Sequence, residues 1–380
     1  MLFFGSAIEK TIYKELPAFI HPFLKNVFKN KKHITKKIFN LILSQFEKKL
    51  KRGYLFSYPY YLVIDPTNIC NLKCPLCPTW QDIEARPKGK MDMQTFRNIL
   101  DEAGQYLFAV NLCNWGEPFL NPELPDMVRY AKKYNTVVGL STNLNYLPDR
   151  TARELIASEV DIIVVSLDGA TQESYTRYRK GGNFSTVLSN IEKLNSYSQN
   201  NKKFPLLIWQ FLVNKYNESE IETARDMAQK MDIQFFPSPM RTSMGKELLL
   251  PLYERVKEMK DWLPLNPAYN KYAYDIRPDT RTRQTTCKWL WNSTVVNWDG
   301  SLSPCCGVFE KIWDFETCYD EKKDKMLTLH QAWNSPHYIL ARKLVAAYMK
   351  KSKDLKLLMP QSEKEGLICS KCIRYGFLED

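Results

Sequence analysis

The chain of 380 residues is 44% apolar and 25% charged, which is ordinary for a globular protein and excludes a collagen-like or low-complexity one. No run of 18 apolar residues occurs and the first residues lack the basic start of a signal peptide, so we exclude a transmembrane helix and expect a cytoplasmic protein. The net charge is +12, but residues 1–52 carry +9 of it, from twelve Lys and Arg against three Glu. A nucleic-acid-binding protein would show its excess charge on the folded domain, so we expect no nucleic-acid partner.

Residues 1–53 are predicted to form a basic amphipathic helical arm. Apolar residues recur there at spacings of three and four, and lysines lie elsewhere on the helical wheel. Two interpretations stay open: the apolar stripe packs on the main domain while the lysines face water, or the arm lies on a partner or on the anionic inner face of the membrane. The stripe consists of Ile34, Ile38, Leu41, Ile42, Phe46 and Leu50, and the lysines are Lys36, Lys37, Lys48 and Lys51.

Residues 54–240 are predicted to form a partial barrel of parallel strands. Short apolar runs alternate with amphipathic stretches, which implies an α/β fold with crossover helices. Six strands are too few for an eight-stranded barrel, and the chemistry of such folds lies at the C-terminal strand ends. The predicted strands are 60–65, 107–113, 137–141, 162–166, 206–213 and 233–236, and the predicted helices are 95–103, 122–134, 148–158, 186–197 and 219–231.

The rest of the chain is predicted to form a bridging segment, residues 241–286, and a small C-terminal domain, residues 287–380. Asp299-Gly300 lies between two short apolar runs and is a strong signal for a two-residue hairpin turn. Cys287 and Cys305 bracket this hairpin.

The cysteines form close-set groups, which in a reducing compartment indicate metal or cluster sites. Cys70, Cys74 and Cys77 form a C-x3-C-x2-C loop directly after the first predicted strand. Three thiolates can hold three corners of a [4Fe–4S] cluster and leave the fourth iron open, as a catalytic site does. The alternative is a zinc site completed by a distant residue, although the chain has only four His and none near the loop.

The loop resembles the signature of the radical S-adenosylmethionine (SAM) superfamily, and the resemblance runs over residues 60–236. One departure is Leu76, where the family more often carries an aromatic residue. The resemblance implies a partial (β/α)6 barrel of the TIM type. It also implies a cluster that a flavodoxin- or ferredoxin-type reductant reduces, SAM on its open iron, and a 5′-deoxyadenosyl radical that abstracts hydrogen from a substrate C–H bond.

Further motifs in the expected order resemble the SAM contacts of this family. Gly116 and Glu117 resemble its Gly-Gly-Glu segment, with Trp115 in place of the first Gly, and Glu117 would accept from the SAM ammonium. Asn143 ends the third predicted strand. A lone Ser or Asn at a strand end is also a common helix cap.

Two further SAM contacts follow from the same resemblance. Ser166, rather than Asp168, is predicted at the ribose, at the end of the fourth strand. Arg179 resembles the arginine that such enzymes direct at the SAM carboxylate, and Arg177 is its rival.

The spacing C-x12-G-x4-C from Cys287 to Cys305 resembles the start of the SPASM/twitch extension of many radical SAM enzymes. With Cys369 and Cys372 it supplies four thiolates, which fit a short twitch-like domain with one auxiliary [4Fe–4S] cluster. The alternative is a structural zinc on the same four thiolates. A fully ligated cluster transfers electrons and does not bind substrate.

These features predict a radical SAM oxidoreductase with two [4Fe–4S] clusters, acting on a small molecule or a peptide. Dehydrogenation of a sugar, cyclitol or polyol is the first hypothesis. The enzyme alternative is an epimerase or a peptide-modifying enzyme with a cysteine hydrogen donor, for which Cys113, Cys306 and Cys318 are candidates, although each is also the kind of residue that packs in a core. The non-enzyme alternative is an iron–sulfur electron carrier or a membrane-docked scaffold.

Overall fold

The computed structural model describes residues 11, 13–81, 85–201, 205–240, 261–270, 287–319 and 326–375. The predicted fold class is confirmed: the chain is a mixed α/β protein whose parallel sheet stays an open, partial barrel, with a helical N-terminal region and a small C-terminal domain. The predicted bridging segment, residues 241–286, lies outside the described residues except for 261–270. No helix within these described ranges is long and apolar enough to cross a membrane.

Six parallel strands form the main part of a nine-stranded sheet with the order β6-β5-β4-β3-β2-β1-β7-β8-β9. Each of the first five strands, β1 to β5, pairs in parallel with the next one along the chain, as crossover connections through helices predict. The strands are β1 (Tyr61–Ile64), β2 (Ala109–Asn111), β3 (Val137–Thr142), β4 (Ile162–Ser166), β5 (Leu206–Val213), β6 (Gln234–Pro239), β7 (Ser293–Val296), β8 (Ser301–Ser303) and β9 (Glu316–Thr317).

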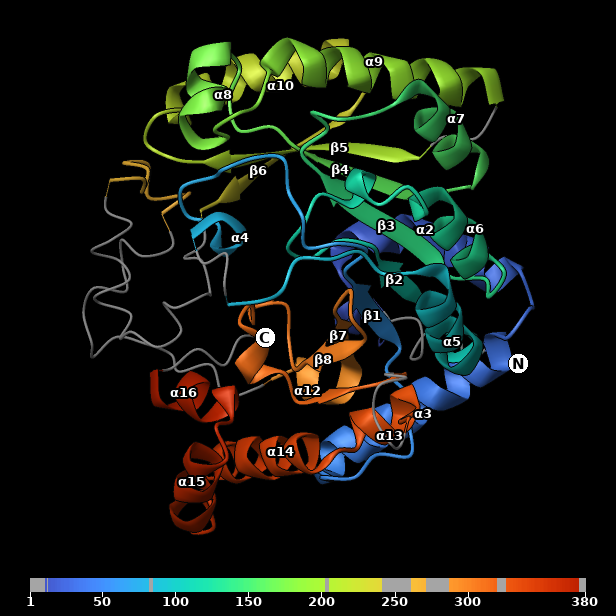
Figure 1. Cartoon of the computed structure of the whole chain (residues 1–380), viewed down its shortest axis with the longest axis vertical. Helices are drawn as coiled ribbons and strands as arrows, with labels where there is room; N and C mark the ends of the chain where they lie inside the picture. Colours follow the sequence, from blue (N-terminus) through green and yellow to red (C-terminus); the bar gives the residue numbers. More distant parts are fainter. Residues whose placement is uncertain are drawn as a thin grey trace.

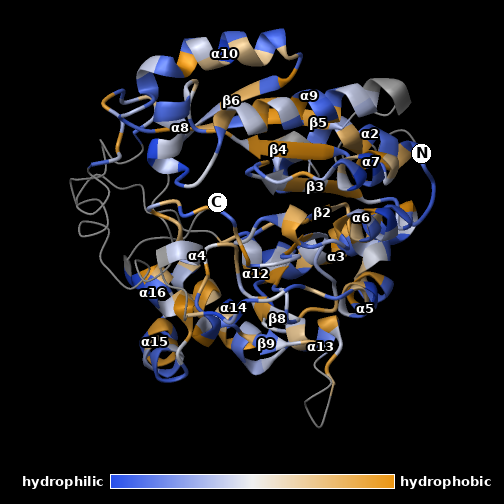
Figure 2. Cartoon of the chain, turned by 45° about the horizontal axis from the view of Figure 1, so that its top comes forward, coloured by the Kyte–Doolittle hydropathy of each residue, from blue (hydrophilic) through white to orange (hydrophobic). Residues whose placement is uncertain are grey.

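One face of the parallel strands is buried under helices. Alternate residues of each strand belong to one apolar core, such as Leu207, Trp209 and Phe211 of β5, which are at most 5% exposed. Figure 2 shows these strands as orange ribbons inside the molecule, with bluer helices outside them. The covering helices are α5 (Met93–Ala103), α6 (Leu124–Lys132), α7 (Asp149–Ala157), α8 (Gln172–Tyr178), α9 (Phe184–Asn201) and α10 (Ile221–Lys230).

The opposite face of the strands lines the inside of the partial barrel, which we call the lumen. At its N-terminal end the arm closes it, since Leu206 of β5 packs in one apolar cluster with Leu24 of the arm. Toward the C-terminal strand ends the facing side chains of Ser141, Ser166 and Gln210 stay partly exposed. The lumen therefore opens at the strand ends where parallel barrels place their chemistry.

The arm consists of α2 (His21–Lys29) and α3 (Ile34–Leu50), and α3 runs along the lower right of the molecule in Figure 1. Of the six residues in the predicted apolar stripe, only Leu41 is buried. The interpretation in which the stripe packs on the main domain and the lysines face water is therefore wrong for Ile42, Phe46 and Leu50, which are 47% or more exposed, and for Lys37, which is buried. Tertiary hydrogen bonds of the polar side, which a helical period cannot show, decide which side faces inward.

The C-terminal domain continues the sheet of the barrel. Strand β7 pairs in parallel with β1, with Tyr61 opposite Ser293, and β8 and β9 follow in antiparallel pairs. Four of its helices follow the sheet along the chain and occupy the lower part of Figure 1. Its helices are α12 (Trp289–Asn292), α13 (Leu329–Trp333), α14 (Pro336–Met349), α15 (Leu355–Lys364) and α16 (Ile368–Tyr375).

The hairpin between β7 and β8 has a three-residue loop and not the predicted two-residue one. Asn297 N–H donates to the oxygen of Ser301 at 2.8 Å, and Gly300 N–H donates to the oxygen of Asn297 at 2.9 Å. Gly300 has a φ of +77°, and a Cβ there would lie 2.5 Å from the oxygen of Cys318. This is the turn followed by a left-handed glycine that three-residue hairpins favour.

Within the described part of the barrel, two short α-helices are absent from the sequence prediction, α4 (Pro78–Gln81) and α8. The Thr171 side chain caps α8 by accepting a hydrogen bond from the N–H of Ser174. The Ser174 hydroxyl in turn accepts from the N–H of Thr171. The usual signal has Glu or Gln at the third position, so a Ser there gives a weak pattern.

Candidate functional site

The three cysteines of the first motif lie on the loop that follows β1. Cys70 accepts from the N–H of Leu72 at 3.5 Å, and Cys77 N–H donates to the oxygen of Cys74 at 3.1 Å. Burial raises the pKa of the Cys74 thiol to about 12, against the opposite effect of nearby Arg179. An apolar shell of Leu72, Leu76, Tyr178 and Met240 packs against the three cysteines.

The segment after β2 lies directly against this loop, and Gly116 makes the approach feasible. A Cβ on Gly116 would lie 1.8 Å from the oxygen of Thr67, so no other residue fits without moving the backbone. The next residue, Glu117, donates its N–H to the oxygen of Ile69 at 2.8 Å. Trp115 points toward the C-terminal domain, where its indole N–H donates to the oxygen of Val308 at 2.9 Å.

The buried carboxylate of Glu117 joins this segment to the end of β3. It accepts from the Thr142 hydroxyl at 2.6 Å and from the N–H of Asn143 at 2.7 Å. Burial raises the pKa of Glu117 to about 7, while these hydrogen bonds lower it. Asn143 in turn extends its side-chain amide to the oxygen of Asn71 at 2.9 Å and to Cys70 Sγ at 3.8 Å.

Arg179 follows α8 and reaches the cysteine loop. Its Nε donates to the carboxylate of Asp168, and its Nη1 lies 3.9 Å from Cys74 Sγ. Burial alone would lower the pKa of Arg179, but Asp168 and Cys74 raise it above its usual range. The rival Arg177 is exposed and stacks at 3.8 Å over the ring of Tyr216, so the structure brings Arg179 and not Arg177 to the loop.

The predicted Ser166 stands at the C-terminal end of β4 on the lumen face, partly exposed. Cys113 follows β2, where burial raises its pKa and the charges of Asp65, Glu117 and Cys70 raise it further. Tyr61 of β1 is within electrostatic range of Cys113 and of Cys306, and burial raises the pKa of its phenol. The thiols of Cys113 and Cys306 therefore both lie within electrostatic range of one side chain of β1.

The four C-terminal cysteines come together from three separate places. Burial raises the pKa of Cys369, and the charges of Cys287, Cys372 and Cys305 raise it further. Cys369 and Cys372 lie one turn apart on α16, Cys287 precedes α12, and Cys305 follows β8. Cys306, next in the chain, is the neighbour whose charge acts most on Cys305.

Cys318, the third predicted hydrogen donor, lies elsewhere. Its thiol is buried and donates to the oxygen of Gly300 at 3.3 Å. Burial raises its pKa, and the charges that act on it are those of Glu102, Asp299 and Glu316. Its surroundings are those of a residue that holds the hairpin, so we leave Cys318 out of the proposed chemistry.

Comparison with known protein families gives two matches, and each matched segment contains one of the two sets of cysteines. Residues 64–228 match the Radical SAM superfamily, and residues 287–373 match the SPASM iron-sulfur cluster-binding domain. The chain belongs to the radical SAM superfamily. It is a radical SAM enzyme with a C-terminal SPASM domain, which confirms the family predicted from the motifs.

Curated relatives of this radical SAM enzyme match parts of it. A tungsten-containing aldehyde ferredoxin oxidoreductase cofactor-modifying protein of Pyrococcus furiosus is 38% identical over 28% of this chain and 30% of its own length. Mycofactocin maturase MftC of Mycolicibacterium smegmatis is 26% identical over 58% of this chain and 54% of its own length. The chain thus spans about half or less of these relatives.

Solved structures show the same fold. Streptococcus suis SuiB bound to S-adenosylmethionine has a TM-score of 0.52 at 14% identity, over 80% of this chain and 69% of that one. SuiB bound to its precursor peptide SuiA has a TM-score of 0.52 at 15% identity, over 79% of this chain and 69% of that one.

The residues of this radical SAM enzyme fit the cofactors that its two domains imply, two [4Fe–4S] clusters and SAM. Three cysteines of one loop would hold the first cluster beneath an apolar shell. The four C-terminal cysteines would hold the second as thiolates, whose mutual repulsion the iron would offset. Within the described ranges, no three His, Cys, Asp or Glu side chains are gathered as around one metal ion. Cluster ligands bind different irons, so they need not surround a single point.

Asp65 is a site residue that the sequence reasoning missed. It ends the β1 segment, is 1% exposed, and neither carboxylate oxygen has a hydrogen-bond partner among the described residues. Burial raises its pKa to about 7, while the N–H groups of Trp115, Gly116 and Asn114 face it without reaching hydrogen-bond geometry. An acidic residue at the end of a predicted strand and before a cysteine loop is the signal that could have found it.

Proposed function

We propose that the enzyme oxidatively modifies a peptide, bound in the lumen between the two cysteine sets. The observation that carries the proposal is the position of two thiols. Cys113 is within electrostatic range of Cys70, Cys306 adjoins Cys305, and Tyr61 is within range of both thiols. A substrate within reach of both thiols would therefore lie between the first cluster site and the auxiliary one.

The cofactors supply the reactive parts of this chemistry, and the chain positions them. When bound, the first cluster and SAM supply a 5′-deoxyadenosyl radical that takes a hydrogen atom from the substrate. Arg179 is held beside Cys74 by Asp168, where it can bind the SAM carboxylate. Glu117 uses part of its acceptor capacity on Thr142 and Asn143, and a carboxylate has further lone pairs for the SAM ammonium.

An oxidation also needs an acceptor for one electron and one proton after the hydrogen atom has left. The four-thiol set has no open ligand position, which suits the group it holds to electron transfer. Asp65 is our candidate for the proton acceptor, because its buried carboxylate has no hydrogen-bond partner among the described residues and burial raises its pKa to about 7. It lies within electrostatic range of Cys113.

The names of the relatives support a peptide as the substrate class. MftC is called a mycofactocin maturase, and SuiB is seen bound to its precursor peptide. The sugar, cyclitol or polyol of the first hypothesis stays as a second candidate, because strands β1 to β5 contain no charged residue. Their lumen side carries hydroxyl and amide groups, such as Ser141, Ser166 and Gln210, that suit neutral hydroxyl groups.

Deuterium transfer into 5′-deoxyadenosine separates these substrate classes. The reconstituted enzyme is incubated with SAM, a reductant and a deuterated cell extract divided into peptide and small-molecule fractions. We expect mass spectrometry to find deuterium only with the peptide fraction, and protease treatment of that fraction to abolish it. Transfer from the small-molecule fraction would favour the polyol, and cleavage of SAM without transfer from either fraction would contradict both.

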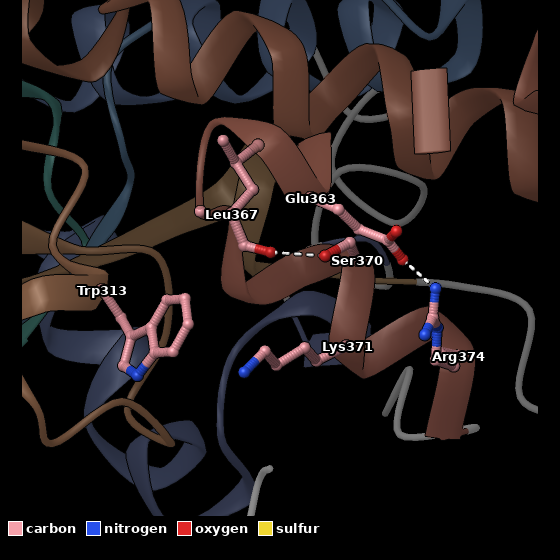
Figure 3. Close-up of a pocket in the computed structure, with 7 residues that line it drawn as sticks. Trp313, Glu363, Leu367, Ser370, Lys371 and Arg374 are labelled. Carbon is pink, nitrogen blue, oxygen red and sulfur yellow. Dashed lines mark hydrogen bonds and ion pairs between the residues drawn. The ribbon is translucent and has the colours of Figure 1, made fainter. Parts of the chain in front are cut away.

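We further propose that a flavodoxin- or ferredoxin-type carrier exchanges electrons at the outer side of α16. A small cavity lies there, and Figure 3 shows Lys371, between the two cysteines of α16, extending toward Trp313. Its Nζ lies 4.4 Å from the centre of that ring. Lys371→Glu should slow reduction by the carrier protein while reduction by dithionite stays unchanged, and equal rates with both reductants would contradict this docking site.

A further inference from the structure

Helix α3 is turned so that its polar side faces the protein. Asn40 exchanges hydrogen bonds of 2.8 and 3.0 Å with the backbone of Tyr58, and the Ser44 hydroxyl donates to the oxygen of Trp291 at 3.0 Å. Asn40 and Ser44 are at most 4% exposed. Tyr58 lies just before β1, and Trp291 belongs to α12. Because both partners belong to the main body of the protein, these hydrogen bonds determine the rotation of α3 about its axis.

Two buried ionisable side chains on the same side secure this orientation. Lys37 Nζ donates to the backbone oxygens of Gly104 and Leu107, and Glu47 accepts from the N–H of Phe56 at 2.7 Å. Both side chains are at most 1% exposed. Turning the helix over would leave these backbone groups without partners, which is costly for buried polar groups.

The opposite side of α3 consequently presents large apolar side chains to the surface. Phe39 is 68% exposed, Ile42 51%, Phe46 56% and Leu50 47%. Their spacing of three and four residues places them on one side of the helix, and we call them the α3 stripe. A single exposed apolar residue needs no explanation, whereas a contiguous apolar surface marks an interaction site.

The described part of the arm, which carries the α3 stripe, has far more exposed cations than carboxylates. The carboxylates among residues 13–52 are those of Glu15 and Glu47. Both carboxylates have partners within the protein: Glu15 forms an ion pair with Lys48 at 3.0 Å, and Glu47 accepts a hydrogen bond from the N–H of Phe56. The exposed cations of the described arm are Lys14, Lys25, Lys29, Lys31, Lys32, Lys36, Lys49 and Arg52.

We propose that the α3 stripe and these cations dock the protein on the surface of an anionic phospholipid bilayer. A bilayer offers an apolar layer to the stripe and phosphate groups to the lysines at the same time. A second copy of this chain would bring lysine against lysine, which disfavours self-association through this side. With 17 residues, α3 is about 25 Å long and would lie in the plane of the interface.

Vesicle sedimentation of the full-length holoenzyme tests this docking. We expect binding to vesicles of phosphatidylcholine with phosphatidylglycerol, little binding to pure phosphatidylcholine, and a steep loss with salt, since charges are screened beyond about 10 Å at 0.1 M. The variant F39Q/I42Q/F46Q should lose at least about tenfold in vesicle affinity while its iron content and SAM cleavage stay unchanged.

A control variant replaces three apolar residues elsewhere that are more exposed than those of the α3 stripe. Leu265, Ile312 and Leu357 are 86%, 81% and 74% exposed, and L265Q/I312Q/L357Q should bind vesicles like the wild type. The proposal would be overturned if the wild type did not bind the vesicles or if both triple variants lost the same affinity. It would also be overturned if binding did not depend on lipid charge and salt. A wild-type dimer in analytical ultracentrifugation that F39Q/I42Q/F46Q dissolves would likewise overturn it, because a second copy would then cover the stripe.

A second measurement does not depend on the fold of a triple variant. In F46W, brominated lipid in anionic vesicles should quench the added tryptophan emission, measured as the difference from the wild type. I312W, which places a tryptophan at an exposed position outside the stripe, is the control. If the emission of F46W were quenched no more than that of I312W, the stripe would not insert into the bilayer.

Discussion

Arg179 donates through its Nε to the carboxylate of Asp168, and this ion pair stands at the C-terminal edge of the sheet. The Asp168 side chain is fully buried, and its other oxygen accepts from the N–H of Leu212 at 2.8 Å. Since the same guanidinium reaches to 3.9 Å from Cys74 Sγ, the strand β5 backbone positions a cation beside the first cysteine loop through Asp168. Asp168 therefore acts as a positioning residue for Arg179.

Asp168→Asn should weaken SAM binding by about tenfold or more, because a buried pair that loses one partner leaves the other charge uncompensated. Equilibrium dialysis of SAM against the reconstituted variant measures the effect. Arg179→Ala should show at least as large a loss, and Arg177→Ala, which removes an exposed side chain stacked on Tyr216, should bind SAM like the wild type. Equal losses in Arg177→Ala and Arg179→Ala would contradict the assignment.

Gly116→Ala should prevent loading of the first cluster, because the new Cβ would lie 1.8 Å from the oxygen of Thr67 and push the cysteine loop away. Iron analysis and SAM cleavage after reconstitution measure the result. Gly139→Ala is the matched control, since its Cβ would have ordinary contacts of 3.6 Å or more, and it should load normally. Full iron content in Gly116→Ala would show that the loop can yield.

Replacing Cys70, Cys74 and Cys77 together by Ala should remove about half of the iron and abolish SAM cleavage. The reason is that the two sets of thiols occupy separate sites, one on the loop after β1 and one in the C-terminal domain. Iron counting on the purified variant gives the answer. Loss of all the iron, or of none, is incompatible with two independent sites.

Cys369→Ala and Cys372→Ala should still cleave SAM but yield less product per 5′-deoxyadenosine, because the auxiliary set loses one of its thiolates. The ratio of 5′-deoxyadenosine to product is the measurement. Cys318→Ala, whose thiol is bonded to Gly300, serves as the control with an unchanged ratio. If instead only Cys113→Ala or Cys306→Ala loses product, the reaction is redox-neutral and that thiol is the hydrogen donor.

Lys37 makes the stability of the fold depend on pH above neutrality. Burial lowers its pKa from 10.5 to about 7, so between these values the unfolded chain binds more protons and the free energy of unfolding rises with pH. The upper limit is about 5 kcal/mol over the whole window. Urea unfolding near pH 7 and near pH 9.5 should show this rise in the wild type and not in Lys37→Met, whereas the exposed Lys49→Met keeps it. Parallel pH profiles of Lys37→Met and the wild type would refute the assignment.

Much of the fold could be predicted because its signals are local. The strands Ile162–Ser166 and Leu206–Val213 have their predicted limits, since short apolar runs between helical patterns are read from adjacent residues. Limits of other elements shift by a few residues, and α8 is absent from the prediction because its cap uses Ser174 where the common pattern has an acid or amide. The resemblance also led to Arg179, but its motif could not show that Asp168 holds the guanidinium.

By itself, the sequence determined the α/β class, the family and the seven cysteines in two groups, because spacing along the chain is enough for each of these. Only the tertiary structure decided that β7 pairs with β1, that the buried Asp65 has no hydrogen-bond partner in the part of the chain that the structure describes, and that α3 turns its polar side inward. These outcomes depend on contacts between residues far apart in the chain, such as Ser44 with Trp291. A helical period shows that two sides differ, but buried polar groups must find partners, and the positions of those partners exist only in the folded chain.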